Sequence, residues 1–131
     1  MLNREAIAYR VHDHLVKQGR KAMSGLNYAY RAPDGDRCAI GCLISDAYYN
    51  EELEDLAATN TSVLVALAHS LNIPMNDITE EDAEFFNILQ RIHDNCPPRS
   101  WPQLLMFIAG NTHMSPGDLG IVIGNSSAYR R

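Results

Sequence analysis

The segment from Thr79 to Pro98 constrains the fold more than any other part of the sequence. Thr79-Glu80-Glu81-Asp82 resembles a helix capping box and places three acidic residues in the first turn, where the positive end of the helix dipole favours them. The apolar residues that follow recur at helical spacing: Phe85, Ile88, Leu89 and Ile92. Pro97-Pro98 then ends the helix, because proline cannot continue it. An amphipathic helix must bury its apolar face, so the pattern predicts helices packed on helices.

Similar start and stop signals divide the rest of the chain. Asn3 is placed to cap a first helix and Gly19 to end it, with an apolar stripe between them at Ile7, Val11 and Leu15. Four more helices are predicted: EELEDLAA after an Asn50 cap, VLVALAHSL between Ser62 and Pro74, LLMFIA after a capping box at Ser100, and LGIVI after Ser115.

An extended arm precedes the sequence CAIGCLI. Tyr28 and Tyr30 alternate with small or polar neighbours, and Pro33-Asp34-Gly35 closes the arm as a turn. CAIGCLI is too short for its periodicity to separate a buried strand from a helix. Asp36 stands two residues before Cys38 and is a good N-cap residue, so we expect a short helix here.

Together these elements predict the fold class. We expect a mainly α, compact, single-domain helical fold of about five to six helices, with a short extended arm or hairpin before the Cys38–Cys42 segment. Residues 1–114 form the helical domain, and residues 115–131 form either a short C-terminal helix or a loose tail.

Composition excludes several classes of function. Sixteen acidic residues against eleven basic ones give a formal charge of −5, and no long Lys/Arg run offers a site for phosphate, so we expect no nucleic-acid binding. No apolar run approaches the ~20 residues that cross a bilayer. Three cysteines do not make a disulfide framework, and the N-terminal residues are unlike a signal peptide. We therefore expect a cytoplasmic protein, in the host cell cytoplasm if it is phage-encoded.

Cys38 and His93 supply the residue types of a nucleophilic enzyme. A thiolate at a helix start has a lowered pKa, and His93, oriented by Asp94, would be its base. Asp94 is the sequence neighbour of His93, however, and is poorly placed to orient its ring. The alternative is that Cys38 and Cys42 are small buried hydrophobic side chains one helical turn apart. No catalytic residue is assigned, and a small Cys/His-dependent hydrolase or transferase stays open.

A metal site would need the same cysteines. Cys38 and Cys42 would share a helix face, with His69, His93 or Cys96 to complete the ligands. Zinc sites usually pair cysteines with two residues between them, and the sequence holds no second close pair. We therefore expect no metal and no cofactor.

Four tyrosines cluster on either side of the cysteines: Tyr28, Tyr30, Tyr48 and Tyr49. Tyrosine is common at protein interfaces, because it combines a large rigid area with a polar tip. The same residues also suit a half-buried arm packed on the helices, and both interpretations stay open.

The order of these motifs resembles one family of small proteins from phages, prophages and bacterial genomes. The resemblance covers roughly residues 5–110, and its most specific parts are CAIGCLI and the later LQ-x-I-H-D helix. A Tyr-x-Tyr-Arg arm and Trp101 before an apolar helix also match. The resemblance implies a compact, mainly helical accessory protein and no reaction.

The resemblance also bears on the cysteines. Its more distant members have alanine at the position of Cys42 and asparagine at that of His93, whereas Cys38, Gly41 and Asp94 keep their type. This pattern favours a structural hub over a catalytic pair or a zinc site. In one interpretation, the hub lines a small pocket.

Asp94 needs compensation, because a negative charge near the C-terminal end of a helix is unfavourable. We expect it to accept hydrogen bonds from the backbone of the 36–39 turn, with Arg37 or the Trp101 indole as further donors. Replacing His93 should cost less than replacing Asp94 if the His93 ring is partly exposed.

The expected function is that of a small cytoplasmic accessory protein of phage or mobile-element type that binds another protein, for host takeover or against host defence. The second alternative to this function, beside the enzyme, is a small-ligand binder with its pocket next to the Cys38–Cys42 segment. A monomer and a homodimer are both compatible with the sequence. The expected binding residues are Tyr28, Tyr30, Arg31, Cys38, Gly41, Tyr49, His93, Asp94 and Trp101.

Overall fold

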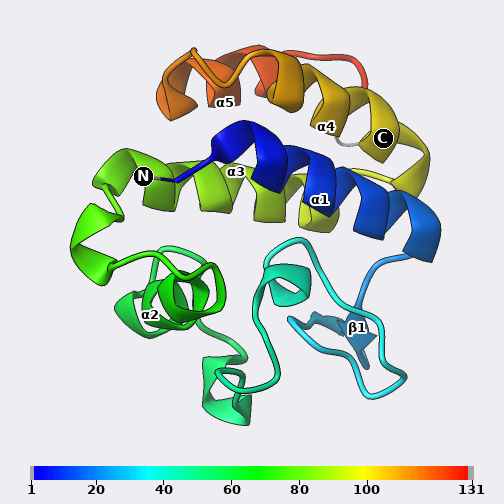
Figure 1. The fold of residues 1–131 in the computed structure, drawn as a ribbon. Helices are drawn as coiled ribbons and strands as arrows, with labels where there is room; N and C mark the ends of the chain where they lie inside the picture. Colours follow the sequence, from blue (N-terminus) through cyan, green and yellow to red (C-terminus); the bar gives the residue numbers. More distant parts are fainter. Residues whose placement is uncertain (1, 130–131) are drawn as a thin grey trace.

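The structure is a computed structural model that describes residues 2–129 (Figure 1). In chain order its elements are α1 (Arg4–Gln18), β1 (Met23–Ser24), β2 (Asn27–Tyr28), α2 (Thr61–Ser70), α3 (Glu80–Asn95), α4 (Trp101–Gly110) and α5 (Pro116–Gly124). Short 3₁₀ turns lie at Gly41–Leu43, Glu51–Leu53, Met75–Asp77 and Pro98–Ser100. The predicted fold class is confirmed: the protein is mainly α, with a small antiparallel hairpin before the Cys38–Cys42 segment.

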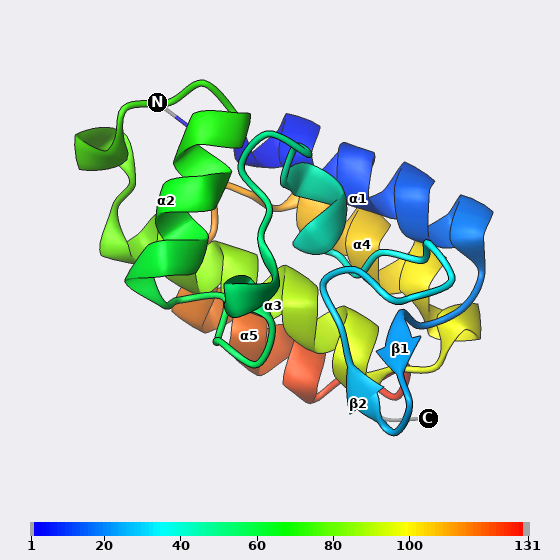
Figure 2. The ribbon, with the colours of Figure 1, turned by 90° about the horizontal axis from the view of Figure 1, so that it is seen from below.

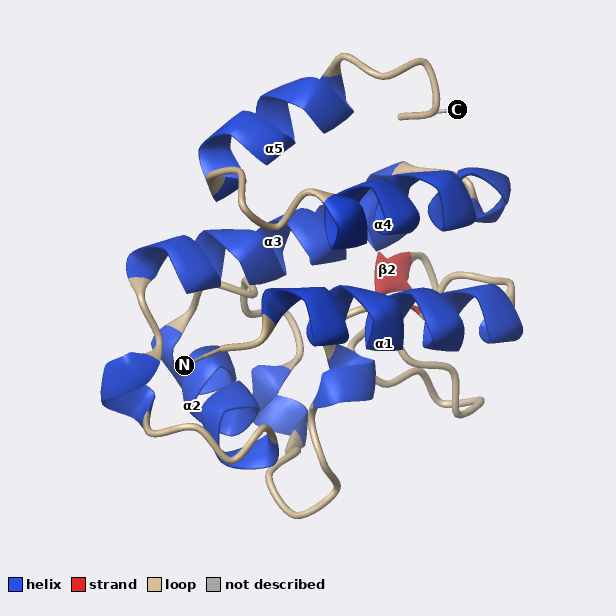
Figure 3. Cartoon of the chain, turned by 45° about the horizontal axis from the view of Figure 1, so that its top comes forward, coloured by secondary structure: helices blue, strands red, loops and turns tan. Residues whose placement is uncertain are grey.

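The helices lie in three levels. In Figure 1, α1 and α3 run side by side through the middle, α4 and α5 lie above them, and α2, the loops and the hairpin lie below. Packing joins α1 to α4 and α3 to α5, and Figure 3 shows this upper level tilted toward the viewer. The largest fully buried side chains include Trp101, Phe85, Phe86, Leu105 and Ile108. Among the described residues, no helix has the length and apolarity to cross a membrane.

Several predicted helix ends are confirmed. Asn3 accepts a hydrogen bond from the Ala6 N–H, and Gly19 ends α1 in the left-handed conformation with φ 72°. Thr79 and Asp82 form both halves of a capping box on α3. These helix ends could be predicted from the sequence, because each signal involves residues within one helical turn.

Two predicted helices are shorter than expected, although Asn50 caps the second of them as predicted. The Cys38–Cys42 segment forms only the Gly41–Leu43 turn, because the carboxylate of its expected cap, Asp36, binds the Arg20 side chain instead. The helix expected after Asn50 stops at Leu53. Asp55 follows with φ 70°, a left-handed conformation that ends any helix.

Two predicted caps are also wrong. α2 is capped by Asn60, whose side chain accepts from the Ser62 N–H, rather than by Ser62. Ser100 makes no side-chain cap, because the 3₁₀ turn at Pro98–Ser100 runs directly into α4 and leaves Ser100 in a helical conformation.

The C-terminal segment contains a helix that packs on the domain. Ser115 caps α5 by accepting from the Asp118 N–H, and Leu119 and Ile123 are buried against the core. α5 lies against α3, as the upper level of Figure 3 shows. Of the predicted segment 115–131, residues 130–131 lie outside the described part.

Candidate functional site

The Cys38–Cys42 segment is held between α1 and α3 by polar side chains that bind its backbone. From α1, Gln18 accepts from the Arg37 N–H at 2.8 Å and donates to the Arg37 carbonyl at 3.0 Å. His14 donates to the same carbonyl at 3.0 Å. From α3, the Gln90 side chain accepts from the Ile40 N–H at 3.2 Å. The buried backbone groups of a loop need such partners, so the two helices fix its path.

His93 fixes a second loop beside this segment. We call the Cys38–Cys42 segment, together with the side chains of α1 and α3 that hold it, the junction. The His93 side chain is fully buried, with the ring stacked on Trp101 at 5.5 Å between centroids. Nε2 lies 3.0 Å from the Ala22 N–H, and Nδ1 lies 2.7 Å from an Asp94 carboxylate oxygen. Because Ala22 is the donor, Nε2 accepts, and the ring proton is assigned to Nδ1. Both nitrogens are therefore occupied by structural hydrogen bonds.

The hydrogen-bond donors predicted for the Asp94 carboxylate are wrong. The carboxylate accepts from the Gln90 amide at 2.9 Å and from His93, rather than from the backbone of residues 36–39. The Trp101 indole donates instead to the Ile92 and Cys96 carbonyls, and Arg37 pairs with Asp46. The expectation that Asp94 is poorly placed to orient the His93 ring is also wrong, because its carboxylate reaches Nδ1 of its sequence neighbour. Asp94 also lies one helical turn after Gln90, so it orients both side chains that hold the loops.

The cysteines are buried thiols. Cys38 is fully buried, and burial raises the pKa of its thiol. Its sulfur accepts from the Gly41 N–H at 3.3 Å. Burial also raises the pKa of Cys42 to about 12, and that thiol donates to the Ala39 carbonyl. Both groups are therefore protonated at neutral pH, the opposite of an activated nucleophile.

The thiol environment predicts slow labelling. In a Cys42→Ser/Cys96→Ser variant, Cys38 should react with a thiol reagent at least about tenfold more slowly in the native protein than in denaturant, because it is buried and protonated. The measurement is the rate of reagent consumption in each state. Fast native labelling that disappears in a further Cys38→Ser variant would contradict the structural role and revive the enzyme alternative.

Arg31 and Tyr49 stabilise the outer side of the junction. The Arg31 guanidinium lies 4.3 Å from the Tyr49 ring centroid, donates to the Ile44 carbonyl and pairs with Asp46 at 2.8 Å. Glu54 accepts from the backbone N–H groups of Tyr30 and Arg31 and from the Tyr49 hydroxyl. Burial and the bond to Glu54 raise the pKa of Tyr49 to about 12. Glu54 was missed in the sequence, where it read as part of an acidic helix.

A cavity of about 370 Å³ lies beside the junction. It brings together Tyr28, Tyr30 and Asp94 of the nine predicted binding residues, with Glu54 and Arg91 on its wall. Tyr28 is half exposed at its mouth. The other six are not in its lining: Cys38, Gly41, His93 and Trp101 are buried, and Arg31 and Tyr49 form the stacked pair.

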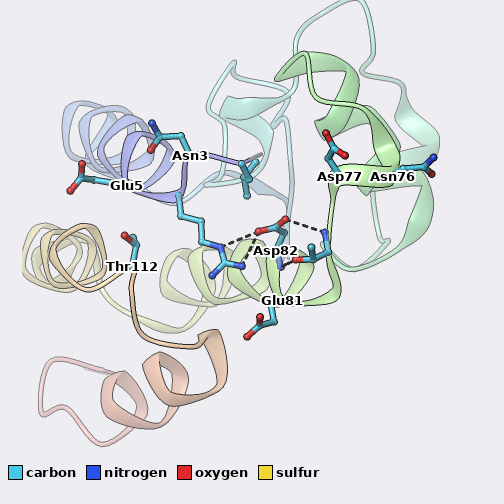
Figure 4. Close-up of a pocket in the computed structure, with 10 residues that line it drawn as sticks. Asn3, Glu5, Asn76, Asp77, Glu81, Asp82 and Thr112 are labelled. Carbon is cyan, nitrogen blue, oxygen red and sulfur yellow. Dashed lines mark hydrogen bonds and ion pairs between the residues drawn. The ribbon is translucent and has the colours of Figure 1, made fainter.

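A larger cavity of about 950 Å³ lies where the first turns of α1 and α3 meet (Figure 4). Asp82 is at its floor, buried, and pairs with Arg4 at 2.9 Å. The other carboxylate oxygen of Asp82 accepts from the Thr79 N–H. Glu5 and Glu81 stand exposed at the rim. The polar groups at the floor therefore bind one another. What the cavity offers to a ligand is its acidic rim, and not a polar group without a partner.

A shallow groove runs along α2. Two hollows, of about 370 and 390 Å³, share Tyr48 as a wall, and we call the pair the Tyr48 groove. Its floor is a helical stripe of α2: Ser62, Val65, Ala66 and His69. Tyr48 is 43% exposed and stacks on His69 at 4.9 Å, and Met75 stands exposed at one end. α2 itself contains no Asp, Glu, Lys or Arg.

Charge is unevenly distributed along the chain that forms this groove. Between Arg37 and Arg91 the chain has no Lys or Arg, yet it carries ten of the sixteen acidic residues. This region contains α2, which lies at one end of the lower level, whereas the hairpin lies at the other, as Figures 1 and 2 both show. The sequence contains this signal, but an overall count of charges conceals it.

No protein-family model, no curated protein and no solved structure matches the chain. The resemblance to the phage and bacterial family thus stays a prediction. Among the residues that the structure describes, no group of three or more His, Cys, Asp or Glu side chains is arranged to hold a metal ion.

Proposed function

We propose that this protein is a non-enzymatic accessory protein that works in the cytoplasm by binding a segment of another protein in the Tyr48 groove. The observation that carries the proposal is the groove itself: a half-exposed tyrosine stands between two hollows on an uncharged helix face. Interfaces are typically anchored by tyrosine in a largely uncharged centre with a polar rim. A phage or mobile-element setting, with a role in host takeover or against host defence, is the part of the proposal that rests on the resemblance of motifs.

The two alternatives have less support. An enzyme that uses Cys38 and His93 would need a thiolate and a free imidazole nitrogen, whereas the thiol is buried with a raised pKa and both nitrogens of His93 are bonded. A small ligand beside the junction would face Glu54 and Asp94, and each carboxylate already accepts at least two hydrogen bonds. The Tyr48 groove instead offers an exposed aromatic ring.

A random-peptide display library, selected on the immobilised protein, tests the proposal. Enriched peptides should bind Tyr48→Ala about tenfold more weakly than the natural chain, because the substitution removes the wall that the two hollows share. Tyr9→Ala is the matched control, since Tyr9 is equally exposed, at 42%, but lies on α1. Unaltered binding to Tyr48→Ala, or no enrichment at all, would contradict the proposal.

A further inference from the structure

The charged side chain that lines the Tyr48 groove is acidic. Glu52 lines the Tyr48 groove directly, and Glu51 beside it is exposed. Asp77 follows Met75 within the same 3₁₀ turn and is exposed, but it lines the larger cavity at the first turns of α1 and α3 rather than the groove. The ion pairs among residues 2–129 involve none of these three carboxylates. An uncharged floor is thus bordered at one end by the carboxylates of Glu51 and Glu52, which take part in none of these ion pairs.

A partner with the opposite charge pattern would fit this surface. From the uncharged stripe, the exposed ring and the acidic residues at one end, we infer that the occupant of the Tyr48 groove is a basic amphipathic segment, with an apolar side chain for the hollows and Arg or Lys toward Glu51 and Glu52. This inference rests on the proposed function and names its partner class.

Three physical effects favour such a segment. A guanidinium can stack on the Tyr48 and His69 rings while pairing with a nearby carboxylate. An acidic partner would be repelled by every charged side chain between Arg37 and Arg91. The same field speeds the encounter with a basic partner, and salt weakens that effect.

A basic protein segment fits the Tyr48 groove better than a nucleic acid or a second copy of this chain would. Phosphate would meet carboxylates at the rim, which excludes nucleic acid on charge. The hairpin end of another copy carries Arg20 and Lys21, but Arg20 is already bound to Asp36 and Lys21 to the Asp94 carbonyl. A dedicated basic segment therefore fits better than self-association.

The test uses three blocked peptides with one amphipathic leucine pattern and Arg, Gln or Glu at every charged position. Binding is followed by NMR chemical-shift changes on the whole protein. The Arg peptide should bind at least about tenfold more tightly than the Gln peptide, shift the amides of α2 and residues 48–53, and weaken as salt rises. Equal binding of the Arg and Gln peptides, or tighter binding of the Glu peptide, would overturn the inference.

Two charge variants locate the effect. Glu51→Gln/Glu52→Gln should reduce the affinity for the Arg peptide about tenfold. Glu80→Gln/Glu81→Gln removes the same charge from the first turn of α3, outside the groove, and should reduce that affinity less than about twofold. Equal losses would mean attraction by net charge alone and would overturn the inference. If the library yields neutral or acidic peptides that depend on Tyr48, the proposed function stands and only the partner class fails.

Discussion

Gly41→Ala is expected to destabilise the protein by about 3 kcal/mol or more, because there is no room for a methyl group at this position. A Cβ on Gly41 would lie 1.9 Å from the Tyr30 carbonyl oxygen and 2.7 Å from its carbon. That carbonyl accepts from the Cys38 N–H, so relieving the clash would separate the arm from the cysteine segment. The measurement is the free energy of unfolding from urea denaturation, with the slope checked for two-state behaviour.

Gly110→Ala provides the matched control. A Cβ at Gly110, the last residue of α4, would meet no atom within 4 Å. The substitution should change the free energy of unfolding by less than about 1 kcal/mol, with stabilisation as the favoured direction. If Gly41→Ala proved as stable as Gly110→Ala, the close approach of Gly41 to Tyr30 would be wrong, and the arm would have to follow another path.

His93→Ala should cost about 3–4 kcal/mol, more than Asp94→Ala at about 1–2 kcal/mol. Removing the ring leaves the Ala22 N–H unpaired in the interior and opens a cavity against Trp101. The Asp94 side chain is 24% exposed, so in Asp94→Ala water can take the place of the carboxylate in some of its hydrogen bonds. This order reverses the sequence-based expectation, which assumed a partly exposed His93 ring.

The exposed His113 provides the control for this comparison. His113→Ala should change the free energy of unfolding by no more than about 0.5 kcal/mol, as most surface substitutions do. All three variants can be compared by urea denaturation under the same conditions. A larger loss in Asp94→Ala than in His93→Ala would indicate that the carboxylate, rather than the imidazole, carries the junction, and the hydrogen-bond assignment would be wrong.

Much of the helical framework could be predicted because its signals are local. The stripe of Phe85, Ile88, Leu89 and Ile92 predicted the buried face of α3, and all four residues are buried. The capping box at Thr79 predicted where this helix begins. Such signals depend on residues three or four positions apart, which stay neighbours in any fold that keeps the helix. Asp36 failed as a cap for the converse reason, because Arg20, sixteen positions earlier, binds its carboxylate.

The candidate site was less predictable, because it depends on residues far apart in the chain. The sequence alone determined the helical class, most helix starts and the uneven distribution of charge. Only the tertiary structure brought His93 to Ala22, seventy-one positions away, and Gln90 to Ile40, fifty positions away. It likewise placed Tyr48 against His69 on α2 and so formed the groove. The physical reason is that buried backbone groups of a loop must find hydrogen-bond partners, and which distant side chain supplies them is settled only once the helices have packed.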